Sequence, residues 1–299
     1  MVRTRHAHVP AFALGASLFG KLPTALDFVR VNHDYPESIE LDRWLQAGLQ
    51  RLAARGQAWP PGILQFVFVA PAARHALIGV VAPSRDRAGR RFPLTVYGRV
   101  PMTALAEGTA LLPLASEEFV RGARAALEQL EALGQSELTN ALRRLRVPEP
   151  RDLAAENARR SNRPDEGQPA LLASGHTAGT RKRAAGSLID ARRHLLQPQG
   201  RAHQGIECFD CPVQTILDVA SWAGIMELTV GHASSYVWST EVDAPRMLIA
   251  PGAPPERLAL FWAAPTQDFP QLCKLGELAA TAAVNGDDLF SELIANLKE

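Results

Sequence analysis

The chain has 299 residues, of which 46% are hydrophobic and 21% are charged. That length and composition suit one large globular domain or two smaller ones. Because 32 basic side chains balance 31 acidic ones, the formal charge is only +1, which gives no global attraction to nucleic acid or to an anionic membrane. No apolar run approaches the roughly 18 residues that a membrane span needs, so we expect no membrane insertion.

Hydrophobic periodicity predicts the elements of the first half of the chain. In order, these are a helix over residues 38–55, strands over 64–69, 76–82 and 92–97, and helices over 116–133 and 136–147. Ser38 is the expected N-cap of the first helix and Ser116 that of the second. A strand is also expected at Leu18 and Phe19. The order of strand, helix, three strands and helices predicts one α/β domain over residues 10–147, with a mixed sheet and helices on its faces.

The second half of the chain begins with a change of composition. Residues 148–203 are rich in Pro, Gly, Ser, Asn, Arg and Glu and contain no aromatic residue, which predicts a flexible linker or insertion. Residues 204–299 then regain apolar periodicity, as a C-terminal α/β part that we expect to complete or extend the same sheet. Its predicted elements are a helix over 213–222, strands over 226–230, 236–240 and 246–250, and helices over 254–263 and 287–297.

The stretch Gly15 to Lys21 has two glycines separated by four residues and followed by lysine, which nearly matches a phosphate-binding loop. Such a loop needs Ser or Thr after the lysine, because the hydroxyl holds magnesium. This chain has Leu22 there, followed by Pro23, which disfavours the helical conformation of Leu22. We therefore expect that Gly20 and Lys21 serve another purpose than nucleotide binding.

The cysteines and the N-terminal residues indicate the cellular compartment of the protein. Cys208, Cys211 and Cys273 are too few for a disulfide-stapled secreted fold. The spacing of Cys208 and Cys211 could serve redox chemistry or half of a zinc site, but no second ligand pair stands at the usual spacing. We interpret them as ordinary thiols near the start of a helix. Arg3 and Arg5 precede a short apolar stretch that Pro10 interrupts, a poor signal peptide, so we expect a cytoplasmic protein without metal or cofactor.

The densest polar feature is the stretch Pro83 to Leu94, which lies between two apolar strands and holds four arginines around Asp86. Its simplest interpretation is a solvated hairpin loop in which Gly89 supplies the turn. Asp86 can also pair with an arginine and order the loop, which would leave other guanidinium groups available for a carboxylate or phosphate.

Several short motifs together resemble the TagF family, also called ImpM, the accessory proteins of bacterial type VI secretion systems. In order they are Gly20-Lys21-Leu22-Pro23, Asp27-Phe28-Val29-Arg30, Trp44-Leu45, the strand 76–81, and Pro83-Ser84-x-Asp86-Arg87-x-Gly89-Arg90-x-Phe92-Pro93-Leu94. The last string is the most specific. A weaker likeness lies in 235–240 and in the segment from Pro251-Gly252 to Leu258. The chain departs from the family at Thr24-Ala25-Leu26, where a small-Arg-Gly step is usual, and at Arg85 and Arg91, which make the loop unusually cationic.

The resemblance implies a three-layer α/β/α fold and a cytoplasmic, non-enzymatic regulator. It implies repression of secretion-system assembly after translation, by binding a forkhead-associated scaffold protein. The residues that we predict to contact this partner are Lys21, Asp27, Arg30, Ser84, Asp86, Arg87, Arg90 and Trp238. An internal ion pair or solvent exposure is an equal alternative for Lys21 and Asp27, and core packing is the alternative for Trp238.

A second hypothesis from a different class is a phosphate- or nucleotide-handling enzyme. It would use Lys21 and the loop from Arg85 to Arg91 to hold an anion. Such an enzyme should also present carboxylates that hold magnesium, and Asp27 and Asp86 are the only evident candidates. We favour the binding protein. The sequence does not define its oligomeric state.

Overall fold

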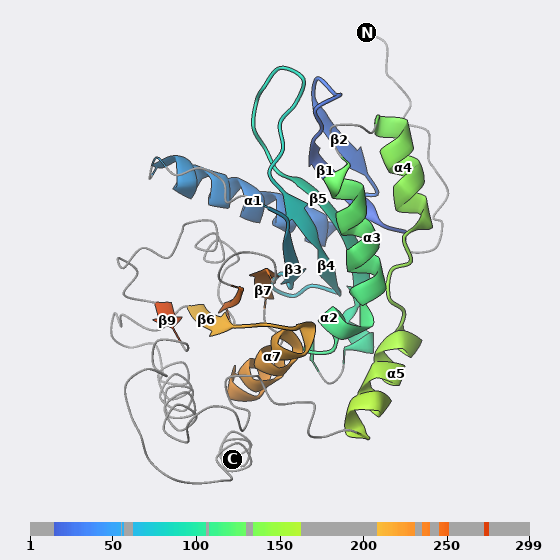
Figure 1. Ribbon diagram of the computed structural model, residues 1–299, viewed down its shortest axis with the longest axis vertical. Helices are drawn as coiled ribbons and strands as arrows, with labels where there is room; N and C mark the ends of the chain where they lie inside the picture. The colour runs from blue at the N-terminus through green and yellow to red at the C-terminus, as the bar shows by residue number, and fades with distance from the viewer. Residues whose placement is uncertain are drawn as a thin grey trace.

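One nine-stranded sheet forms the middle of the fold (Figure 1). The computed structural model describes residues 15–54, 56, 62–105, 108–129, 134–162, 208–230, 235–239, 245–250 and 272–274. The strands are β1 (Ser17–Lys21), β2 (Phe28–Val31), β3 (Leu64–Phe68), β4 (His75–Ala82), β5 (Leu94–Pro101), β6 (Cys208–Pro212), β7 (Ser235–Ser239), β8 (Arg246–Ala250) and β9 (Leu272–Lys274), in the spatial order β2-β1-β5-β4-β3-β7-β8-β6-β9. Neighbours are antiparallel except β6 and β9, which run parallel, so the sheet is mixed.

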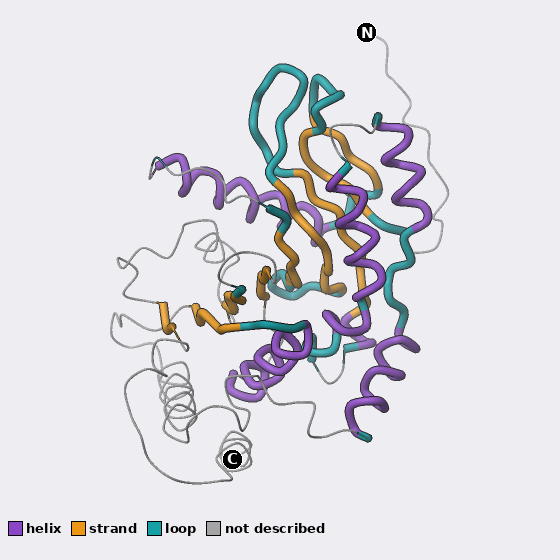
Figure 2. The backbone as a smooth tube through the Cα atoms, in the orientation of Figure 1, coloured by secondary structure: helices purple, strands orange, loops and turns teal. Residues whose placement is uncertain are grey.

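Helices cover both faces of the sheet (Figure 2). They are α1 (Pro36–Ala54), the 3₁₀ turn η1 (Met102–Ala104), α2 (Leu112–Ala115), α3 (Glu117–Glu128), α4 (Gln135–Arg144), α5 (Pro150–Ser161) and α7 (Ile216–Val230). Helix α1 packs Trp44 on Phe66 and Phe68, whereas α2, α3, α4, α5 and α7 contribute to a separate core on the opposite face. The predicted three-layer α/β/α sandwich with a mixed central sheet is confirmed.

The central strands explain why the sheet holds two cores. Strands β3, β4 and β5 carry apolar residues at successive positions and are buried almost throughout, as expected for strands that are covered on both faces. Because successive side chains point to opposite faces, Phe66 and Phe68 face α1 while Val67 between them joins the other core.

The C-terminal strands extend the same sheet. Strand β7 pairs with β3 in the register Phe66↔Val237. The Ser235 hydroxyl accepts a hydrogen bond from the Val69 amide at 2.8 Å and lies 3.2 Å from the Val69 carbonyl. Segments that are 166 residues apart in the chain therefore lie side by side.

A carboxylate joins α7 to the loop that precedes α2. Glu227 accepts hydrogen bonds from the Thr109 amide at 2.7 Å, from the Thr109 hydroxyl at 2.5 Å and from the Ala110 amide at 3.3 Å. The Tyr236 hydroxyl donates to the Thr109 carbonyl at 2.9 Å, and burial raises the pKa of Tyr236 well above its usual value. These bonds fix the C-terminal helix and strand against the first half of the chain.

Several predicted elements need correction. Residues 150–161 form α5, so this part of the predicted linker 148–203 is helical; Leu153 anchors it in the core and Arg146 pairs with Asp152 at 2.8 Å. Residues 226–230 continue α7 rather than form a strand. Ser38 lies inside α1, whose first residue is Pro36. Ser116 occupies the N-cap position of α3 as predicted, although its side chain makes no capping hydrogen bond.

Other predicted elements exist with different bounds or fall on residues outside the described ranges. The strand predicted over 92–97 exists but runs from Leu94 to Pro101. The helices predicted over 254–263 and 287–297 lie outside the described residues. Cys208 and Cys211 lie on strand β6, not at the start of a helix. None of the helices in the described ranges is long and apolar enough to cross a membrane.

Candidate partner-binding surface

A buried carboxylate organises the loop between β4 and β5. Asp86 is 2% exposed and accepts hydrogen bonds at 2.7 Å from both Lys21 Nζ and Arg90 Nε. Its other oxygen accepts the backbone amides of Ala88 at 3.0 Å and Arg90 at 2.9 Å. The carboxylate thus binds two cations and two amides, which satisfies its hydrogen-bonding capacity.

The charge of Asp86 follows from these contacts. Burial by itself would raise the pKa of the carboxyl, but the hydrogen bonds from Lys21 and Arg90 lower that pKa from 3.8 to about 2. Asp86 is therefore ionised at neutral pH, as a paired and hydrogen-bonded carboxylate should be. Lys21 is itself buried, so its ammonium is committed to this pair.

The same loop is fastened to the turn between β1 and β2. Arg90 donates through its guanidinium to the Leu26 carbonyl at 2.6 Å, and the Arg87 amide donates to the Ala25 carbonyl at 2.8 Å. The Ser84 hydroxyl donates to the Lys21 carbonyl at 2.7 Å. Figure 1 shows the two loops next to each other at one end of the sheet. They form one ordered unit.

Gly20 has a structural reason to be glycine. Its φ is +140°, and a Cβ built there would lie 2.0 Å from the Pro93 carbonyl oxygen and 2.7 Å from Leu94 Cα. Only glycine permits so close an approach of β1 to β5 in that conformation. Gly20 and Lys21 are the last two residues of β1 and do not form a phosphate-binding loop. The close approach of β1 to β5 explains the glycine that makes this stretch resemble such a loop.

The outer side of the two loops carries exposed apolar and cationic side chains. Leu26 is 65% exposed and Phe28 is 38% exposed. We call the exposed residues Leu26, Asp27, Phe28, Arg30, Arg87 and Arg90 the loop-tip surface. The Phe28 ring stacks on Phe19 at 5.5 Å and meets Phe92 edge-on at 4.9 Å, so this surface rests on a rigid aromatic base.

Residues 17–145 match the family of the TagF N-terminal domain, which is described as type VI secretion system-associated. This part of the chain is similar to the TagF N-terminal domain. The match covers the stretches with the Gly20-to-Pro23 and Pro83-to-Leu94 motifs, and it confirms the resemblance that these motifs indicated.

The whole chain is similar to a solved structure. The crystal structure of PA0076 from Pseudomonas aeruginosa PAO1 is similar at 18% sequence identity with a TM-score of 0.48, over 83% of this chain and 93% of that chain. None of the curated proteins compared with the chain matches it.

The fold brings seven of the eight predicted partner-binding residues to one end of the sheet. Lys21 and Asp86 are buried in the ion pair, which is the internal alternative considered for Lys21, and Ser84 is half-buried. The loop-tip surface contains the other four, Asp27, Arg30, Arg87 and Arg90. Partner binding by these four residues remains a prediction. Trp238 is separate from them, on β7.

Trp238 is fully buried within the sheet core. It pairs in register with Gln65 of β3 and lies 5.7 Å from the Tyr236 ring. In this structure Trp238 packs in the core and offers no exposed area to a partner, which agrees with core packing, the alternative to a partner contact.

Sequence reasoning missed Leu26 and Phe28, the exposed apolar part of the loop-tip surface. A signal for them was present, because two large apolar residues flank Asp27 where the turn leads into β2. It also missed a buried network in which the Tyr97 hydroxyl donates to Ser38 Oγ at 2.8 Å and lies 2.8 Å from His33 Nδ1. Burial lowers the pKa of His33, which keeps this network neutral.

Metal chemistry finds no support in the parts of the chain that the structure describes. Within them, no group of three or more His, Cys, Asp or Glu side chains could hold a metal ion. Asp27 is exposed at the turn, whereas Asp86 is buried in its ion pair. The two carboxylates named as candidates for magnesium therefore differ completely in setting.

Proposed function

We propose that this chain is a non-enzymatic, cytoplasmic regulator of a type VI secretion system, which represses assembly after translation by binding a forkhead-associated scaffold protein. The match of residues 17–145 to the TagF N-terminal domain supports the association with type VI secretion. The observation that carries the proposed binding role is the loop-tip surface, where exposed apolar side chains stand among three arginines and one aspartate.

The physical composition of that surface suits a protein partner. Aromatic and arginine side chains are enriched where binding energy concentrates in protein interfaces. Phe28 is already packed on its inner side by Phe19 and Phe92, so little side-chain entropy is lost when a partner covers it. The hydrogen bonds of Arg90 hold the underlying loops in one conformation.

The test is calorimetric titration of the full chain with the purified forkhead-associated scaffold of the same secretion system. The double variant Leu26→Ala/Arg87→Ala removes one apolar and one cationic group from the loop-tip surface. Because interface hot spots cost about 2 kcal/mol or more when truncated, affinity should fall by roughly 30-fold or more. The free energy of unfolding in urea should change by about 0.5 kcal/mol or less, since both groups are exposed.

A matched control exists on α1, where Ile39 is 50% exposed and Arg43 is exposed near it. The double variant Ile39→Ala/Arg43→Ala removes the same kinds of group away from the loops and should bind the scaffold as the parent chain does. Absence of binding by the parent chain would refute the scaffold as partner. Equal affinities of the two double variants would refute the surface.

The phosphate-handling alternative is tested by thermal unfolding with Mg-ATP in excess. Lys21 would have to leave Asp86 to reach a phosphate, so we expect an unchanged melting temperature. A ligand that binds the folded state at about 100 times its Kd stabilises it by about 2.7 kcal/mol, and such a shift would favour the enzyme.

A further inference from the structure

The two exposed apolar residues of the loop-tip surface are each linked to Asp86 through one other side chain. Arg90 donates to the Asp86 carboxylate through Nε at 2.7 Å and to the Leu26 carbonyl through its guanidinium at 2.6 Å. The Lys21 ammonium lies 2.7 Å from the same carboxylate and 5.2 Å from the centre of the Phe28 ring. One buried carboxylate therefore supports both Leu26 and Phe28 from the inner side of the loops.

Backbone contacts tie Arg87 to the same centre. Asp86 Oδ1 accepts the backbone amides of Ala88 at 3.0 Å and Arg90 at 2.9 Å, and these bonds hold the turn of the β4–β5 loop. The Arg87 amide lies within that turn and donates to the Ala25 carbonyl of the β1–β2 turn at 2.8 Å. The place of the Arg87 side chain on the surface thus depends on the loop that Asp86 holds together.

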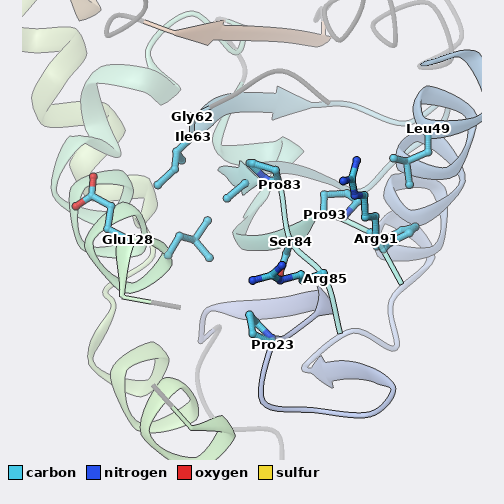
Figure 3. A pocket seen from close by; sticks show the side chains of 13 residues that line it. Pro23, Leu49, Gly62, Ile63, Pro83, Ser84, Arg85, Arg91, Pro93 and Glu128 are labelled. Atoms are coloured by element: carbon cyan, nitrogen blue, oxygen red, sulfur yellow. The ribbon is translucent and has the colours of Figure 1, made fainter. Parts of the chain in front are cut away.

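Ser84 supplies a further tie between the two loops. Its hydroxyl donates to the Lys21 carbonyl at 2.7 Å. Figure 3 shows Ser84 on the stretch of the β4–β5 loop that runs from Pro83 toward Pro23 of the β1–β2 turn. The side chain is half-buried, and its hydroxyl is bonded to the protein itself.

Three of the residues predicted to contact a partner have their polar groups directed inward. Lys21 is 6% exposed and Asp86 is 2% exposed. We propose that Lys21, Ser84 and Asp86 are positioning residues, which set the affinity of the loop-tip surface for its partner by holding that surface in one conformation, without contacting the partner. A surface that is ordered before binding loses less conformational entropy when the partner arrives. This inference rests on the proposed function, because it takes the loop-tip surface as the binding site.

The size of the effect follows from the population of the binding conformation. The apparent affinity of a protein falls in proportion to the fraction of molecules that are in that conformation. Asp86→Asn removes the negative charge that holds Lys21 and Arg90, and charge-assisted hydrogen bonds are roughly twice as strong as neutral ones. We expect the surface to be ordered in about a tenth of the molecules, which gives about tenfold weaker binding.

Amide hydrogen exchange, followed by NMR on the full chain, measures the order of the loops without any partner. The Arg87 amide is the reporter, because it bonds to the Ala25 carbonyl and not to Asp86. In Asp86→Asn its exchange should be roughly tenfold faster, whereas Ile78 in the middle of β4 should keep the rate of the parent. Ser84→Ala removes one tie without leaving a buried charge. It should change exchange and binding in the same direction, and it replaces Asp86→Asn if that variant does not fold.

Calorimetric titration with the forkhead-associated scaffold measures the consequence for binding, and Asp86→Asn should bind about tenfold more weakly than the parent. Glu227→Gln is the matched control, because it also neutralises a carboxylate that ties two distant segments, but on α7, away from the two loops (Figure 1). Its affinity should stay within about twofold of the parent.

A double-mutant cycle distinguishes positioning from direct contact. When Asp86→Asn is added to Leu26→Ala/Arg87→Ala, it should weaken binding much less than it does alone, because the side chains that Asp86 positions have been removed. A residue that contacts the partner by itself would instead cause the same loss in both backgrounds.

Four results would overturn the proposal: unchanged exchange of the Arg87 amide, affinity of Asp86→Asn within about twofold of the parent, an equal loss of affinity in Glu227→Gln, or additive losses in the cycle. Absence of scaffold binding by the parent chain would refute the proposed function separately. Faster exchange of the Arg87 amide in Asp86→Asn would then still support positioning of the surface by Asp86, and an unchanged rate would overturn it.

Discussion

Replacement of Gly20 by alanine separates the structural explanation of the Gly20-Lys21 step from the nucleotide-loop explanation. The new Cβ would lie 2.0 Å from the Pro93 carbonyl oxygen, against backbone atoms that cannot rotate away. A residue other than glycine at φ +140° adds backbone strain of about 1–3 kcal/mol. Forcing a methyl group into a filled site adds about 1–3 kcal/mol. We therefore expect a loss of about 2–6 kcal/mol, a large part of the roughly 5–15 kcal/mol that holds a domain folded.

The matched control is Gly89→Ala in the neighbouring loop. Gly89 also has a positive φ, +81°, but a Cβ there meets nothing within 4 Å. Its expected cost is the conformational part only, about 1–2 kcal/mol. Urea unfolding of the parent and both variants, analysed with a shared m-value, measures the difference. If Gly20→Ala costs no more than Gly89→Ala, or leaves stability unchanged while it abolishes nucleotide binding, the close approach of β1 to β5 is not the reason for the glycine.

Three further predictions concern buried or half-buried groups. Hydrogen bonds lower the pKa of Asp86 in the folded protein from 3.8 to about 2. The contribution of Asp86 to stability should therefore be present above about pH 4 and be lost as pH falls toward 2. Asp86→Asn should reduce the pH dependence of the unfolding free energy between these values, and an unchanged pH dependence would contradict the pairing. Glu227→Ala should lower the unfolding free energy by about 1–3 kcal/mol, since it leaves buried donors unpaired, whereas the exposed Glu118→Gln should be neutral in the same thermal scan. Trp238→Ala should lower the unfolding free energy by about 3–5 kcal/mol. The affinity of the folded fraction for the scaffold, measured by calorimetry, should stay unchanged. A loss of affinity without a loss of stability would show that Trp238 contacts the partner.

Local patterns predicted much of the first half of the fold, because each element there has a clear period or boundary. Helix α1 shows apolar residues at helical spacing, and β3 and β4 are short apolar runs with prolines beyond them. The errors fall where burial is atypical. Helix α5 buries little besides Leu153, so its polar composition resembled a linker. Helix α7 is apolar on most sides, and periodicity cannot distinguish the end of such a helix from a buried strand.

For the candidate site, the motifs located the right loops but not the roles of their residues. Lys21 and Asp86 are 65 residues apart, and nothing local shows that the chain brings them into contact. Only the pairing of β1 with β5 and of β5 with β4 places the β1–β2 turn against the β4–β5 loop. That contact buries one carboxylate among cations and leaves Leu26 and Phe28 outside. Whether a charged side chain faces a partner or its own core depends on which distant segment covers it, because burial is a property of the packed chain and not of the residue.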